Sequence, residues 1–84
     1  MRTKTEIDQE IFNLRQLKPV GMHQDRTANK IECIIEELEG GLDETADEWD
    51  GMTDGEQDCV RQARMWKEGD TQTKPSEGWG NLVR

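Results

Sequence analysis

This chain of 84 residues has a formal net charge of -8, with 36% charged and 31% hydrophobic residues. The length allows one small domain with a thin core, and no apolar run approaches the roughly 18 residues of a membrane-spanning helix. Twelve Asp or Glu residues and no Lys or Arg lie between positions 31 and 58. This concentration of negative charge disfavours direct binding to nucleic acid and to acidic lipid surfaces.

The N-terminal segment predicts an amphipathic helix of about four turns. Thr3 and Glu6 have the spacing of a capping box in which Thr3 is the N-cap. The apolar stripe that follows consists of Ile7, Ile11, Leu14 and, at its edge, Leu17. We expect the helix to end at Lys18, because the residue before a proline avoids helical backbone angles.

The second predicted helix has the most regular pattern in the chain. Asp25 or Thr27 can cap it, and Gly40 and Gly41 stop it. Its apolar stripe follows the i, i+3, i+4, i+7 rule and consists of Ile31, Ile34, Ile35 and Leu38. One flank of this stripe carries three carboxylates, those of Glu32, Glu36 and Glu39. Cys33 points almost opposite the stripe and is expected to be exposed.

Two more helices are expected downstream. The helical spacing of three apolar residues predicts a short acidic helix, and these residues are Leu42, Ala46 and Trp49. A second capping box, from Thr53 to Glu56, opens the last helix, which Gly69 terminates. One face of this helix carries Cys59, Ala63 and Trp66, with Val60 at its border and Arg61 and Arg64 pointing away.

These patterns predict an all-α fold, because no segment keeps the period of two that strands require. Three main helices and a short fourth are expected to pack as a small bundle. Residues 1–69 would form the helical domain and residues 70–84 an extended C-terminal tail. Trp79, Leu82 and Val83 either tie this tail to the domain or leave it mobile.

Little in the sequence supports catalysis, so we expect no enzyme. His23 and Cys33 could pair as base and nucleophile, but a loop histidine and a structural thiol are the simpler interpretation. No closely spaced Cys and His ligands suggest zinc. Asp43, Thr45 and Asp47 match the first ligand positions of a calcium loop, but its turn glycine is replaced by Glu48 and its final glutamate by Asp54. We therefore expect neither a metal nor a cofactor.

Cysteine usage bears on the compartment. Two cysteines and no signal-peptide-like hydrophobic stretch predict a reduced, cytoplasmic protein, because a secreted scaffold of this size usually carries four or more. A single bridge between Cys33 and Cys59 remains open.

The acidic block has two interpretations. It can be a solvated face that is partly neutralised by the cations of the last helix, Arg61, Arg64 and Lys67. It can instead dock on a basic surface of another protein, including one that normally holds nucleic acid. From Glu32 to Glu39 the helix presents three carboxylates over about 10 Å, whereas duplex DNA places about six charges along that length. Mimicry of nucleic acid therefore requires the next carboxylates on the same surface, namely Asp43, Glu44, Asp47, Glu48 and Asp50.

Two aromatic residues are candidate interface anchors. Phe12 lies about 140° from the centre of its helix's apolar stripe, which predicts partial exposure unless it packs under the tail or on another helix. Trp79, between two glycines of the tail, has the same two alternatives. An exposed aromatic beside a charged surface is typical of an interface, and an exposed Cys33 could contribute to a homodimer.

Four short motifs resemble small acidic proteins encoded by bacteriophages and prophages. They are Thr5-Glu6-Ile7-Asp8-Gln9-Glu10, Glu48-Trp49, Trp66-Lys67-Glu68-Gly69 and Pro75-Ser76-Glu77-Gly78-Trp79. That group has no established activity, so the resemblance implies a bacterial host cell as the setting and no role for a single residue. Phage accessory proteins of this size and charge often block host machinery, as anti-CRISPR and anti-restriction proteins do, and several are acidic nucleic-acid mimics.

The leading hypothesis is a non-enzymatic phage-type inhibitor that binds a basic surface of a host nucleic-acid-processing protein, such as a CRISPR effector or a restriction enzyme. The expected contact residues are the carboxylates and aromatics already named, namely Glu32, Glu36, Glu39, Asp43, Glu44, Asp47, Glu48, Asp50, Phe12 and Trp79. The alternative is a small helical assembly adaptor or homodimer that acts through apolar contacts. Direct nucleic-acid binding and membrane binding are not expected.

Overall fold

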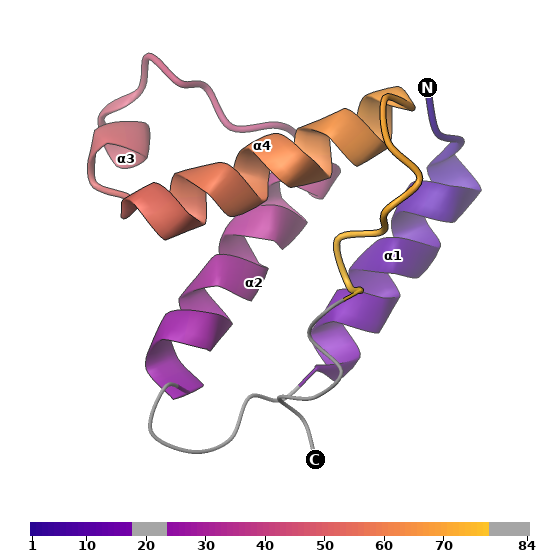
Figure 1. The fold of residues 1–84 in the computed structure, drawn as a ribbon, viewed down its shortest axis with the longest axis horizontal. Helices are drawn as coiled ribbons and strands as arrows, with labels where there is room; N and C mark the ends of the chain where they lie inside the picture. The colour runs from indigo at the N-terminus through magenta and orange to yellow at the C-terminus, as the bar shows by residue number, and fades with distance from the viewer. Residues whose placement is uncertain (18–23, 78–84) are drawn as a thin grey trace.

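The computed structural model describes the backbone of residues 1–17 and 24–77, and the side chains of residues 1–17 and 28–77 (Figure 1). The predicted all-α bundle is confirmed, since these residues form four helices and no strand. In chain order the helices are α1 (Lys4–Gln16), α2 (Gln24–Glu39), α3 (Asp47–Asp50) and α4 (Asp54–Glu68). α1 and α2 run antiparallel, and α4 crosses the end of α2 where α2 terminates (Figure 1).

The N-terminal cap of α1 is formed by the residue that the sequence indicates. The Thr3 hydroxyl accepts a hydrogen bond from the Glu6 N–H at 3.2 Å. At the other end Gln16 is the last helical residue, and the Leu17 N–H donates to the Leu14 carbonyl at 3.1 Å. The expected stop at Lys18 lies just beyond, outside the described residues.

α2 begins earlier than expected and ends where expected. Asp25 and Thr27 lie inside the helix, so the prediction that one of them is the N-cap is wrong. Once a helix is nucleated, each further residue adds a backbone hydrogen bond, so a helix extends past a residue that could have capped it. At the C-terminus Gly41 has a φ of 86° and its N–H donates to the Glu37 carbonyl at 3.0 Å. This left-handed conformation favours glycine.

α3 is shorter than its apolar spacing predicts. Leu42 and Ala46 precede the helix, and only Trp49 of the expected apolar set lies within it, where it is buried. The Asp43 carboxylate accepts hydrogen bonds from the N–H and the hydroxyl of Thr45, at 2.9 and 2.7 Å. Such local side-chain bonds stabilise a turn in competition with helix.

α4 has the best-defined ends. Both halves of the Thr53–Glu56 capping box are formed. Gly69 adopts a φ of 90°, and the following N–H, of Asp70, donates to the Met65 carbonyl at 2.8 Å. This pairing closes the helix end with a left-handed glycine, as the sequence predicts.

The core lies where α1, α2 and α4 meet. It consists of Leu14, Ile31, Ile34, Leu38, Ala63 and Trp66. Val60, at the border of the apolar face of α4, is fully buried outside this core cluster. Cys33 is half-buried rather than exposed, since its thiol contacts Glu56 of α4 at 3.4 Å.

The described part of the C-terminal tail is held against the helical domain. We call residues 70–77 the strap; in Figure 1 it runs from the end of α4 back toward α1. The Glu10 carboxylate, which is 1% exposed, accepts hydrogen bonds from the Ser76 N–H at 2.6 Å and from the Ser76 hydroxyl at 2.9 Å. Trp79, Leu82 and Val83, which were expected to decide the tail's position, lie outside the described residues.

The segment before α1 meets the end of α4. The Arg2 N–H donates to the Lys67 carbonyl at 2.9 Å, and the Arg2 guanidinium lies 5.1 Å from the centre of the Trp66 ring. The same guanidinium donates to the Thr71 carbonyl at 2.8 Å. Arg2 thus joins α1, α4 and the strap.

Candidate acidic interface

Three predicted carboxylates lie along one flank of α2. Glu32, Glu36 and Glu39, which we call the acidic row, are all exposed. Their spacing of four and three residues places neighbouring carboxylates side by side on a helix surface. Like charges at this spacing repel one another, so a nearby positive charge would stabilise the acidic row.

Glu36 joins the acidic row to α3. Burial raises the pKa of Glu36, as do a hydrogen bond shared with Glu48 and repulsion from Glu48, Glu32 and Glu39. Among the residues with described side chains, no Lys or Arg forms an ion pair with Glu32, Glu36 or Glu48.

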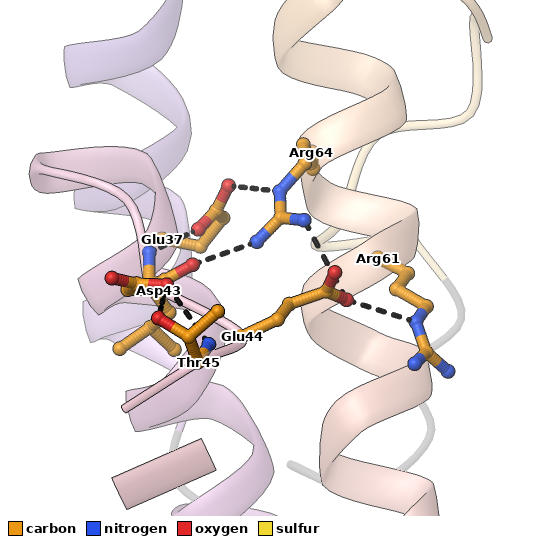
Figure 2. Close-up of polar contacts among 7 residues, drawn as sticks. Glu37, Asp43, Glu44, Thr45, Arg61 and Arg64 are labelled. Carbon is orange, nitrogen blue, oxygen red and sulfur yellow. Dashed lines mark hydrogen bonds and ion pairs between the residues drawn. The ribbon is translucent and has the colours of Figure 1, made fainter. Parts of the chain in front are cut away.

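Two other predicted carboxylates are paired within the chain. Glu39, at the end of the acidic row, contacts Arg15 of α1 at 3.1 Å. Glu44 contacts Arg61 at 3.3 Å and Arg64 at 3.7 Å (Figure 2). Arg64, which was predicted with Arg61 to point away from the apolar face of α4, is half-buried between Glu37 and Glu44. Arg61 and Arg64 therefore neutralise part of the acidic block.

Glu37, like Glu10, is a buried structural carboxylate that was not among the predicted site residues. It is 2% exposed, and its carboxylate accepts hydrogen bonds from Arg64 Nε at 2.8 Å and from the Leu42 N–H at 2.6 Å. The hydrogen bond to Glu37 raises the pKa of Arg64. Glu37 borders the apolar stripe of α2 on the flank opposite the acidic row. This position on the helix was the only sequence feature that could have indicated its burial.

The remaining predicted carboxylates lie in and before α3. Asp43, Asp47 and Asp50 are all exposed. Hydrogen bonds from the Thr45 hydroxyl and N–H lower the pKa of Asp43, so this carboxylate already has local donors (Figure 2). The structure therefore brings Glu48 to the acidic row, while Glu44 turns toward α4.

The two aromatic candidates have different outcomes. Phe12 of α1 is 57% exposed. This agrees with the partial exposure predicted from its helical position, and not with the alternative that another element covers it. Trp79 lies outside the described residues.

The cysteines lie between α2 and α4 and are both free. Burial, followed by a hydrogen bond to Glu56, raises the pKa of Cys33 to about 12. Burial also raises the pKa of Cys59. A thiol with so high a pKa is almost entirely protonated near neutral pH and is a poor nucleophile. His23, the residue that could act as its base, lies outside the described residues.

The described part of the chain shows neither a metal site nor a membrane-spanning helix. No group of three or more His, Cys, Asp or Glu side chains with described positions could hold a metal ion. None of the described helices combines the length and hydropathy needed to cross a bilayer.

Comparison with known protein families, curated proteins and solved structures gives no match for this chain.

Proposed function

We propose that this chain is a non-enzymatic inhibitor that binds a basic surface of a nucleic-acid-processing protein through the acidic row and Glu48. The observation that carries the proposal is the group of Glu32, Glu36 and Glu48, whose carboxylates are adjacent, exposed and not ion-paired to any described Lys or Arg. A cationic partner surface would relieve the repulsion within this group. Charge complementarity of this kind mainly increases the association rate and the specificity of binding.

The resemblance to small acidic phage proteins supports a bacterial host target, for example a CRISPR effector or a restriction enzyme. Internal pairing of Glu39 and Glu44 lowers the uncompensated charge of the surface. The geometry therefore favours a local contact with Lys or Arg side chains over imitation of a whole DNA duplex, whose charge is about six per 10 Å.

Affinity capture from bacterial lysate tests this proposal. The tagged chain should recover a nucleic-acid-binding protein, and recovery should fall steeply as salt is raised, because exposed charges are screened. A triple variant with Glu32→Gln, Glu36→Gln and Glu48→Gln should lose the partner.

A matched control removes the same number of charges from the C-terminal end of α4 and from the strap. It carries Glu68→Gln, Asp70→Asn and Glu77→Gln, all at exposed positions. This control should retain the partner. Equal recovery by the acidic-row variant and the unmodified chain would refute the proposal.

Phe12 supports a second candidate, a helical assembly adaptor or homodimer that acts through apolar contacts. A phenylalanine that is 57% exposed is a candidate anchor for such an interface. Sedimentation at several salt concentrations separates the candidates. An apolar homodimer would keep a doubled mass at high salt and lose it in a Phe12→Ser variant, whereas the acidic-surface inhibitor predicts a monomeric mass for both proteins.

A further inference from the structure

The α1–α2 pair leaves an apolar groove beside the acidic row. Two shallow hollows of about 480 and 240 Å³ follow one another along the two helices. Their apolar lining includes Ile7 and Ile11 of α1 and Ile35 of α2, which are half-buried against the core and still reach solvent. The groove therefore offers apolar area that no described element covers completely.

The rims of the groove are charged, with an excess of negative groups. The α2 rim is the acidic row. The α1 rim carries Lys4 and Arg15, but Lys4 is paired with Asp8 at 2.8 Å and Arg15 with Glu39 at 3.1 Å. Four carboxylates thus face two cations, which leaves two negative charges for an occupant to neutralise.

The groove has the length of a short helix. From Ala28 to Glu39 α2 rises by about 17 Å, which corresponds to about three turns. A helix laid in a groove between two helices is a common mode of peptide recognition, with anchors at i, i+3, i+4 and i+7. A peptide that binds by strand addition would need a sheet edge, and the described part of the chain has no strand.

We propose that the α1–α2 groove binds a short amphipathic helix of the partner, with apolar residues on the face that enters the groove and Arg or Lys residues beside that face. The apolar anchors contact Ile7, Ile11 and Ile35, and the cations contact Glu32 and Glu36. A second copy of this chain fits poorly, because its net charge of -8 would bring further negative charge to the same rim. The inference rests on the proposed function, since it assumes that the acidic row meets a partner.

Synthetic peptides test the occupant directly on the full chain. The probe is a 12-residue helical peptide with Leu at the anchor positions and Arg at the flanking positions, titrated into ¹⁵N-labelled protein. Two controls have the same length: one scrambles the sequence, and the other replaces each Arg by Glu. The patterned cationic peptide should bind at least about tenfold more tightly than either control, because only it satisfies both the apolar and the charged contacts.

Chemical-shift changes locate the bound peptide without mutation. Changes at the amides of Ile7, Ile11, Ala28 and Ile35 support the groove. Equal binding by the scrambled peptide, with changes confined to the acidic row and α3, overturns the helix-in-groove mode. Equal binding by the Glu-flanked peptide overturns the charge requirement. A doubled mass of the free protein, with the groove amides shifting on dilution, would make a second copy the occupant.

The natural partner separates this inference from the proposed function. An Ile35→Gln variant should weaken capture of the partner, and the patterned peptide should compete with it, whereas Glu77→Gln should have no effect. Capture that depends on Glu32, Glu36 and Glu48 but resists both Ile35→Gln and the peptide overturns the groove alone. Capture that ignores the carboxylates overturns the proposed function, whatever the peptide does.

Discussion

Neighbouring glutamates of α2 have opposite roles because of where each side chain points. Glu36 is exposed among other carboxylates, whereas Glu37 is buried and bound to Arg64. One residue along a helix rotates the side chain by about 100°, which moves it from the acidic row to the flank that meets α4. The same residue type is therefore exposed among like charges at one position and buried in an ion pair at the next.

Glu37 should be the carboxylate whose loss destabilises the fold most. A Glu37→Gln variant should lower the free energy of unfolding by about 2–3 kcal/mol, because it weakens charge-assisted hydrogen bonds in a buried site and leaves Arg64 without its main partner. Urea denaturation measures this change. Glu44→Gln, which breaks exposed contacts to the same arginine, should cost less than about 1 kcal/mol. Equal losses in the two variants would contradict the buried role of Glu37.

Glu36 should show the opposite behaviour. Its pKa is raised above the ordinary 4.5, first by burial and then by Glu48 and the acidic row, so the folded state disfavours its charged form. This penalty is fully present above the raised pKa and disappears as the pH falls below the unfolded value. Glu36→Gln should therefore raise the free energy of unfolding at pH 7 by a few tenths of a kcal/mol, about the size of one like-charge pair. Near pH 4 the substitution should leave the free energy of unfolding unchanged.

Thermal melts at the two pH values measure this difference. Asp58→Asn, which removes an exposed carboxylate of α4 outside the acidic row, serves as the control and should change the melting temperature little at either pH. A Glu36→Gln variant that is less stable than the unmodified chain at pH 7 would show that crowding of the carboxylates is not the dominant effect.

At the scale of elements, the strap depends on one buried carboxylate. Glu10 accepts from the Ser76 N–H, the Ser76 hydroxyl and Asn13 Nδ2, the last at 3.2 Å. Glu10→Gln places an amide group opposite these donors and should destabilise the strap by about 1–3 kcal/mol. Hydrogen exchange at the Ser76 amide should accelerate accordingly, whereas exchange in the centre of α4 should change less.

Ser76→Ala provides the matched comparison for the strap. It removes only the hydroxyl and keeps the N–H bond to Glu10, so the Ser76-position amide should exchange faster than in the unmodified chain and slower than in Glu10→Gln. An unchanged exchange rate in Glu10→Gln would mean that other contacts hold the strap.

Helix ends and apolar faces were predictable from the sequence because both depend on local geometry. The helix caps form between residues that are close in the sequence, as at Thr3, the Thr53–Glu56 box and Gly69. Their partners can therefore be read from the local sequence. Two local predictions were wrong, the N-cap of α2 and the length of α3. The other features that the sequence does not indicate are contacts between distant segments. Arg64 bonds to Glu37 across 27 positions, and Cys33 is covered by Glu56 across 23 positions. A helical wheel gives the direction of each side chain, but not which element lies in that direction.

The arrangement of the candidate acidic interface was predictable only in part for the same reason. The spacing of Glu32, Glu36 and Glu39 identifies the acidic row from α2 alone. Glu48 lies near Glu36, whereas Glu44 is paired with Arg61 of α4. Both positions depend on how the segment from residue 42 to α3 folds back. The groove likewise needs two helices in contact, so neither apolar stripe indicates it separately.

At the scale of the molecule, the excess negative charge should make stability depend on salt. A net charge of -8 on a small fold gives repulsion that salt screens, while the exposed ion pairs that salt weakens contribute little. We expect the melting temperature to rise by roughly 2–6 °C between 0.05 and 0.5 M NaCl. Circular dichroism melts measure this shift, and a falling melting temperature would mean that the internal ion pairs outweigh the repulsion.

The contacts of Arg2 have a consequence for synthesis on the ribosome. Residue 2 bonds to the carbonyls of Trp66, Lys67 and Thr71, so the N-terminal segment reaches its final place only after residue 71 has been translated. Until then the nascent α1 and α2 can pair but lack α4, which would cover their shared apolar residues. During translation this protein should therefore pass through a stage with exposed apolar surface, of the kind that chaperones bind.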